Sequence, residues 1–197
     1  MIYMKPKDAG SAGWVIWFVG LPGAGKSTYA QAVSQALNDR GYNVRYLSMD
    51  QRRQAYLTTP QYTPEERDKA YRLFAEEAAQ IANQGINVIV DGTAPKLSMR
   101  QFLRRMVPRF VEIYVHCPLE TAMNRESNRP EGSVMGDLYK KAIERKQTGK
   151  HFEGLGEVVG VDTPFEENPN AECVIESDQM NFDGGLDRIL KFLVSFL

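Results

Sequence analysis

Short runs of apolar residues recur along the chain, and most are followed by a stretch with helical spacing. Residues 14–19 read WVIWFV, a continuously apolar run rich in aromatic and β-branched side chains. This pattern is typical of a strand buried on both faces, as in a parallel sheet. Similar runs predict four more strands, at residues 44–49, 86–90, 110–115 and 173–175.

The stretches between these runs predict helices. The clearest start is at Thr63, because Thr63-Pro64-Glu65-Glu66 is a capping box with Pro64 at the first helical position. Further helices are expected at residues 26–40, 96–106, 118–127 and 137–147, and from Leu186 to Phe196. Strands that alternate with helices predict a parallel sheet joined by right-handed crossovers. We therefore expect an α/β fold of three layers, with a mainly parallel five-stranded sheet.

Residues 20–28, GLPGAGKST, lie between the first predicted strand and the first predicted helix. They match the pattern GxxxxGK[ST] in the context that a phosphate-binding P-loop requires. Glycines let the backbone wrap closely around phosphate, and the helix N-terminus adds its positive dipole end. We therefore expect the phosphates of ATP or GTP to bind here, with Lys26 as a catalytic residue at the β- and γ-phosphates and the Ser27 hydroxyl as a ligand of Mg²⁺. The expected ATP-binding residues of the loop are Gly20, Leu21, Pro22, Gly23, Ala24, Gly25, Lys26, Ser27 and Thr28.

Two acidic residues follow predicted strands, where ligands of open α/β sheets lie. Asp50 follows the second strand and Asp91 the third. Phosphoryl transfer to an alcohol needs a carboxylate that orients the hydroxyl and takes its proton, and we assign Asp50 to that catalytic role. Asp91 follows the apolar run NVIV in the manner of a Walker B acid, so we assign it to Mg²⁺, directly or through water. For each acid, a helix cap or a solvated turn residue is the alternative.

Arginines would complete such a site, because a guanidinium fork matches the geometry of phosphate. The candidates include Arg53 and Arg72 on the acceptor side, and Arg125 and Arg129 at the start of the long connection after residue 127. Arg125 is assigned to ATP binding and catalysis. Arginine is also common on exposed helix faces, which is the alternative for each of them.

Residues 128–170 form a connection rich in Gly, Pro, Asn and Glu that is too long for a simple loop. We interpret residues 128–160 as a lid that excludes water from the transferring phosphoryl group, with Lys140 in reach of substrate phosphates. An ordinary surface insertion is the alternative. The rest of residues 14–197 is expected to be one domain, after a flexible leader at residues 1–13.

Charge and cysteine content narrow the class further. The 24 basic and 25 acidic side chains nearly cancel, which gives no general reason to bind nucleic acid or a membrane. The start of the chain has no apolar region typical of a signal peptide, and the apolar run at residues 14–21 is too short to span a bilayer. Cys117 and Cys173 lie in or beside apolar runs, so we expect two buried thiols, no disulfide framework and a cytoplasmic protein.

Four segments together resemble the adenylylsulfate kinase family: GLPGAGKST, FVEIYVHCPLETAMNRE, DLYKKA and GVDTPFEENPNAECVIES. The resemblance covers most of residues 14–178. It implies a P-loop kinase fold and transfer of the γ-phosphate of ATP, with Mg²⁺, to the 3′-hydroxyl of adenylylsulfate. It therefore implies a small nucleotide acceptor, and it leaves a homodimer open.

The acceptor side departs from the family pattern. The family's DGDNxR stands here as Ser48-Met49-Asp50-Gln51-Arg52-Arg53, so only the second Asp and the Arg are retained. A Ser-Phe-Ile-Ser-Pro run is replaced by Asp91-Gly92-Thr93-Ala94-Pro95. An Asn and two adjacent Arg on the capped helix correspond to Ala70, Arg72 and Leu73.

One aromatic platform for the acceptor's adenine is replaced by Val158, while the other is retained as Tyr62. The resemblance thus implies acceptor-binding roles for Asp50, Arg53, Tyr62, Arg72 and Lys140. Two alternatives remain open: a kinase of another small hydroxyl compound or nucleotide, and a nucleotide-binding NTPase regulator.

Overall fold

The computed structural model describes residues 12–57, 62–128 and 136–197. Most of the predicted leader, Arg129, and the first part of the predicted lid lie outside these ranges. Gly13, which we had included in the leader, donates its backbone N–H to the Ala82 carbonyl at 2.7 Å. Residue 13 therefore belongs with the domain.

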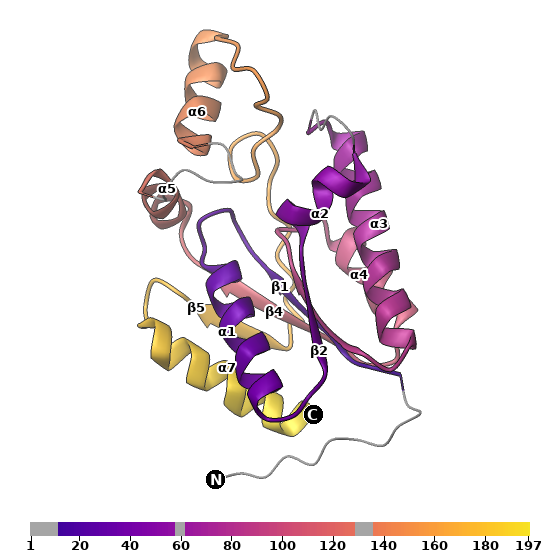
Figure 1. Cartoon of the computed structure of the whole chain (residues 1–197). Coiled ribbons are helices and arrows are strands. Elements are labelled where there is room, and N and C mark those ends of the chain that lie inside the picture. The colour runs from indigo at the N-terminus through magenta and orange to yellow at the C-terminus, as the bar shows by residue number, and fades with distance from the viewer. Residues whose placement is uncertain (1–11, 58–61, 129–135) are drawn as a thin grey trace.

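Five parallel strands form one sheet, as predicted, and no described strand runs antiparallel. The order is β2-β3-β1-β4-β5, with β1 in the centre (Figure 1). Every residue of β1 is buried, which explains why its sequence is continuously apolar. The strands are β1 (Val15–Val19), β2 (Val44–Ser48), β3 (Asn87–Asp91), β4 (Phe110–His116) and β5 (Cys173–Glu176).

Helices cover both faces of the sheet and complete the three layers (Figure 1). Side chains of β1 point alternately to the two faces of the sheet. Ile16 and Phe18 pack with α1 and α7 on one face, whereas Val15 and Trp17 pack with α3 and α4 on the other. The helices are α1 (Lys26–Asp39), α2 (Met49–Tyr56), α3 (Pro64–Asn83), α4 (Leu97–Met106), α5 (Leu119–Ser127), α6 (Leu138–Thr148) and α7 (Phe182–Phe196). In the described ranges, none of them is long and apolar enough to cross a membrane.

The start of α3 was predicted from its capping residues, whereas the start of α2 was not. Thr63 caps α3 as predicted, and its side chain accepts a hydrogen bond from the Glu66 N–H at 3.3 Å. Helix α2 was not predicted, because it begins at Met49 directly after β2 without a side-chain cap or a punctuating Gly or Pro. Its support is electrostatic, with Asp50 in the first turn and Arg53 in the last.

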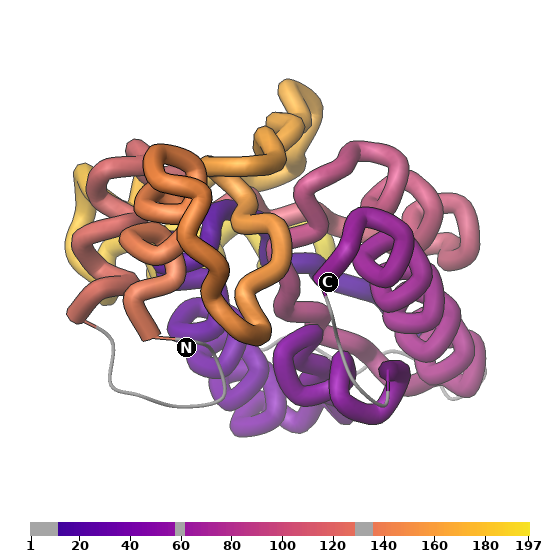
Figure 2. The backbone as a smooth tube through the Cα atoms, turned by 90° about the horizontal axis from the view of Figure 1, so that it is seen from above, coloured from indigo at the N-terminus to yellow at the C-terminus, as the bar shows by residue number. Residues whose placement is uncertain are grey.

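The region predicted to be a lid includes a loop after α6 that is exposed at residues 149–151, 153 and 154 but buries Leu155, Val158 and Val159. Tyr139 and Ala142 of α6 are fully buried in the core, and the Tyr139 hydroxyl donates to the Pro22 carbonyl at 2.9 Å. After the loop, Asn168 donates to Glu112 at 2.9 Å, and Glu112 also pairs with the buried Arg100 at 2.9 Å. Seen from above, the segment after α6 extends toward α2 and α3 (Figure 2). Helix α6 is thus part of the packed core and not of an open insertion.

Candidate active site

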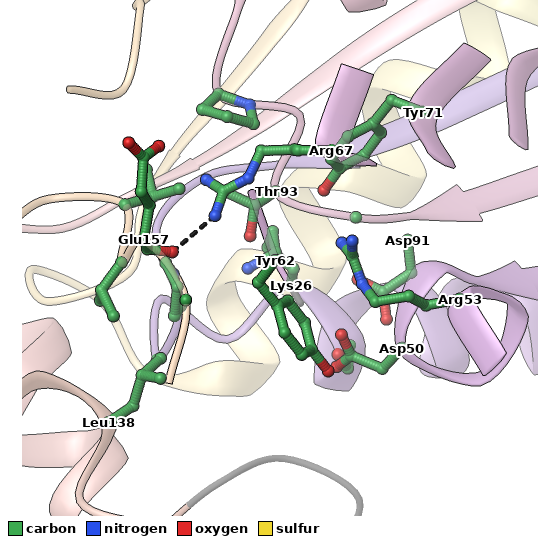
Figure 3. A pocket seen from close by; sticks show the side chains of 18 of the residues that line it. Lys26, Asp50, Arg53, Tyr62, Arg67, Tyr71, Asp91, Thr93, Leu138 and Glu157 are labelled. Atoms are coloured by element: carbon green, nitrogen blue, oxygen red, sulfur yellow. Dashed lines mark hydrogen bonds between the residues drawn. The ribbon is translucent and has the colours of Figure 1, made fainter. Parts of the chain in front are cut away.

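The pocket lies at the carboxyl ends of β1, β2 and β3, where the strands are followed by loops and helix N-termini. Figure 3 shows the side chains that line it. Its wall is formed by the loop before α1, the start of α2, the start of α3 with the turn after β3, and residues 154–159, with Arg125 of α5 and Leu138 of α6. Open parallel sheets bind ligands at this edge. Neither cysteine lines this pocket, and both are buried free thiols, as expected.

The P-loop backbone has the conformation that the glycines were expected to allow. Gly20, Gly23 and Gly25 have φ of 140°, 83° and 99°, a region that side chains strain. A Cβ on Gly20 would lie 2.2 Å from the Val115 carbonyl oxygen, and one on Gly23 would lie 2.3 Å from the Ala122 carbonyl oxygen. No other residue type fits at these two positions without moving the backbone.

Lys26 lies across this loop at the mouth of α1. Its side chain is 8% exposed and its Nζ donates to the Leu21 carbonyl at 2.8 Å. Pro22, Gly23, Gly25, Lys26, Ser27 and Thr28 line the pocket, while Gly20, Leu21 and Ala24 shape the loop without being part of the lining. A buried ammonium in a ring of glycines is suited to the phosphates of a nucleotide.

Asp91 is buried beside the P-loop. Its carboxylate accepts a 2.7 Å hydrogen bond from the Tyr46 hydroxyl and a hydrogen bond from the Ser27 side chain. Burial raises the pKa of Asp91, while the positive charge of Lys26 and these two hydrogen bonds act in the opposite direction. A carboxylate and a hydroxyl at the end of a P-loop are oxygen donors that Mg²⁺ prefers, so the residues fit this ion.

Asp50 lies nearby in the first turn of α2, with an exposed side chain that lines the pocket. Figure 3 shows Asp50 and Asp91 on the same side of the cavity, with Lys26 close by. The negative charge of Asp50 adds to the factors that raise the pKa of Asp91. The two acids thus differ in environment, since Asp50 is exposed to the pocket and Asp91 is buried beside the P-loop.

Two buried guanidinium groups lie on the acceptor side of the pocket. Arg53 and Arg67 are 7% and 6% exposed, and the Nη1 atom of each is buried without a hydrogen-bond partner among the described residues. Arg67 Nη2 donates to the Glu157 carbonyl at 2.5 Å, and Arg53 lies over the ring of Tyr62, 4.9 Å from its centroid (Figure 3). Burial lowers the pKa of Arg67, and the charge of Arg53 contributes to the same effect.

The predicted acceptor residues are only partly brought together. Asp50, Arg53, Tyr62 and also Arg125 line the pocket, and Arg125 is held by Ser177, to whose Oγ and backbone O it donates at 2.9 and 2.7 Å. Arg72 is exposed elsewhere on α3, with its guanidinium 5.3 Å from the centroid of Phe102. Lys140 is exposed on α6 and is absent from the lining.

Sequence reasoning missed Arg67, Tyr71 and Thr93, which all line the pocket. Arg67 could have been predicted as a site residue, because it lies in the first turns of a helix whose capped start was predicted. The Tyr71 hydroxyl accepts a hydrogen bond from the Ala94 N–H at 2.8 Å and so supports the turn after β3. That contact joins residues far apart in the sequence, and no local pattern predicts it.

A glycine loop between a central strand and a helix, with two acids at neighbouring strand ends, defines this protein as a P-loop kinase. The family model of adenylylsulphate kinase matches residues 12–176. The chain therefore belongs to the adenylylsulphate kinase family, and the P-loop, the parallel sheet and the kinase class predicted from the sequence are confirmed.

Curated adenylyl-sulfate kinases are similar in sequence to this protein over most of its length. A probable adenylyl-sulfate kinase of Archaeoglobus fulgidus is 34% identical over 166 residues, which are 84% of this chain and 97% of that protein. An adenylyl-sulfate kinase of Paraburkholderia xenovorans is 35% identical, with 93% and 94% covered. The fold is similar to that of the Mycobacterium tuberculosis APS kinase CysC in complex with AMPPNP and APS, with a TM-score of 0.76, 22% identity, and 93% and 99% of the two chains covered.

Proposed function

We propose that this protein transfers the γ-phosphate of ATP to the 3′-hydroxyl of adenylylsulfate. The observation that carries the acceptor assignment is the pair Arg53 and Arg67, two buried cations with unpartnered nitrogens beside the flat ring of Tyr62. Buried charge is costly unless it is paired, so this arrangement favours an anionic acceptor. Adenylylsulfate offers an anionic phosphosulfate for the arginines and an adenine ring for Tyr62.

The residues of the chain divide the chemistry among them. Lys26 and the loop amides hold the phosphates, and Arg125 contributes to the ATP side of the pocket. Ser27 and Asp91 would hold Mg²⁺, which neutralises charge on the β- and γ-phosphates when it is bound. Asp50 orients the acceptor hydroxyl and takes its proton.

A second acceptor, another small hydroxyl compound, is favoured by one specific observation. Val158 is 2% exposed and lines the pocket where the family has a Phe, so an adenine ring would meet an aromatic wall at Tyr62 and an aliphatic one at Val158. A regulator that only binds nucleotide is disfavoured, because the buried Nη1 atoms of Arg53 and Arg67 would then have no ligand to donate to.

An acceptor screen tests the proposal directly. ATP consumption is measured with adenylylsulfate, nucleosides, sugars and polyols, and the product is identified by mass spectrometry. We expect adenylylsulfate to give the highest kcat/KM and a 3′-phosphorylated product. A sugar or polyol that exceeds adenylylsulfate would establish the second acceptor instead, and ADP formation that no acceptor stimulates would support the regulator.

Arg67→Ala is expected to raise the KM for adenylylsulfate by about 10- to 100-fold, because it removes charged hydrogen bonds to the acceptor. The affinity for ATP should stay within about twofold. Steady-state kinetics with each substrate varied in turn measures both values. Arg72→Ala is the matched control, since Arg72 is exposed on the same helix outside the pocket. If both variants shift the acceptor KM equally, the assignment of Arg67 is wrong.

We also propose that residues 149–160 form the moving part of the lid. Gly149, at the end of α6, and Gly160 have φ of 74° and 97°, so turns at both ends of the segment suit glycine. In the described state, the Glu157 N–H donates to the Tyr62 carbonyl at 3.4 Å, and Arg67 donates to the Glu157 carbonyl. The segment therefore already contacts α3 across the acceptor side.

Hydrogen exchange is expected to show increased protection at residues 149–160 when a non-hydrolysable ATP analogue and the acceptor are both bound. The buried α6 residue Tyr139 should be protected in both states. Equal protection of residues 149–160 with and without ligands would mean that the segment is a fixed insertion.

A further inference from the structure

Tyr46 of β2 has a hydroxyl that reaches Asp91, the acid assigned to Mg²⁺, on the neighbouring strand β3. Strands β2 and β3 pair in parallel, with Tyr46 opposite Ile89 and Ser48 opposite Asp91. Because side chains alternate along a strand, Tyr46 and Ser48 lie on the same face. The Tyr46 hydroxyl donates to Oδ2 of Asp91 at 2.7 Å.

The hydrogen bond from Tyr46 constrains the orientation of the buried Asp91 carboxylate. Asp91 is 4% exposed, and its side chain is bonded by Tyr46 from one strand and by Ser27 from the start of α1. With Oδ2 accepting from the phenol, the carboxylate plane is set relative to the P-loop. Without the phenol, Oδ2 would lose the donor that sets its direction, while Ser27 and the charge of Lys26 would remain.

We propose that Tyr46 is a positioning residue that orients Asp91 for the Mg²⁺ accompanying ATP. The inference rests on the proposed function, in which Asp91 and Ser27 hold that ion. Residues hydrogen bonded to metal ligands fix ligand orientation, and their loss typically lowers metal affinity by about 10- to 100-fold. Tyr46 is not among the residues that line the pocket, so its effect on the ion is expected to pass through Asp91.

Tyr46→Phe tests this role, because it keeps the ring and removes only the donor. Binding of Mn²⁺, a spectroscopic substitute for Mg²⁺, is measured by electron paramagnetic resonance in the presence of a non-hydrolysable ATP analogue. We expect Tyr46→Phe to weaken Mn²⁺ binding by about 10-fold or more. The affinity for the ATP analogue in EDTA should not change. In turnover assays, the Mg²⁺ concentration for half-maximal rate should rise by a similar factor.

Tyr114→Phe is the matched control. Tyr114 also donates its hydroxyl to a carboxylate, Glu167 at 3.0 Å, but neither residue lines the pocket. Its removal should leave Mn²⁺ affinity unchanged. A double-mutant cycle supplies the second test: in the Asp91→Asn background, Tyr46→Phe should cause little further loss of Mn²⁺ affinity, because the two residues act as one unit.

Two failures can be told apart. If the wild-type protein binds Mn²⁺ with the ATP analogue and Tyr46→Phe binds it equally well, the role of Tyr46 is overturned and the kinase proposal stands. If the losses from Tyr46→Phe and Asp91→Asn are fully additive, Tyr46 does not act through Asp91. If the wild-type protein shows no metal-dependent binding of the analogue, the proposed use of Mg²⁺ is itself wrong.

Discussion

Lys26→Ala is expected to lower kcat/KM by at least about 10²–10³-fold, the typical cost of removing one charged or hydrogen-bonding group from a transition state. Lys26 is the ammonium that crosses the glycine loop, and its Nζ bond to the Leu21 carbonyl holds it there. Charge on the transferring phosphoryl group would lose this partner. Steady-state kinetics with the preferred acceptor measures the loss.

The fold should survive this change. The Lys26 side chain contributes little apolar area to the core, so circular dichroism and the melting temperature should stay close to wild type. Lys140→Ala is a control of the same residue type, because Lys140 is exposed outside the pocket. A folded Lys26→Ala protein with wild-type turnover would remove the basis of the kinase mechanism.

Asp50→Asn is expected to reduce kcat by about 10²–10⁴-fold, the usual contribution of a general base. The substitution keeps the shape of the side chain and leaves the P-loop intact, so ATP affinity should change little. Asp91→Asn should behave differently, with a higher Mg²⁺ requirement as its main effect. Rate measurements over a range of Mg²⁺ concentrations separate the two acids.

The matched control for Asp50 is Asp39→Asn, an exposed acid at the end of α1 that accepts a 2.7 Å hydrogen bond from Gln35. It should leave kcat unchanged. Near-normal rates in Asp50→Asn would show that Asp50 only supports the first turn of α2 and that another group takes the proton.

The ATP side of this site was predictable because its signals are local. A buried strand, a glycine loop and a helix start follow one another within residues 14–40, and each can be recognised from consecutive residues. The strand-end positions of Asp50 and Asp91 follow from the same reasoning, since the carboxyl ends of parallel strands share one edge. The capped start of α3 was equally local and was confirmed.

The acceptor side was less predictable because its contacts are long-range. Arg67 meets Glu157 across 90 positions of the sequence, and Tyr71 supports the turn at Ala94. Arg72 follows Tyr71 directly but lies on the exposed face of α3, which only the helical rotation set by the buried stripe decides. Helix α2 escaped prediction because it begins without a break after β2.

The pairing of Ser48 with Asp91 bears on how this site is compared with those of its relatives. Ser48 stands where the family pattern has its first Asp, and the register places Asp91 directly beside it on the next strand. The position that holds an Asp in that pattern therefore has an Asp as its neighbour here, on the adjacent strand. An Asp restored at position 48 alone would lie next to Asp91 and repel it, so the two arrangements exclude one another.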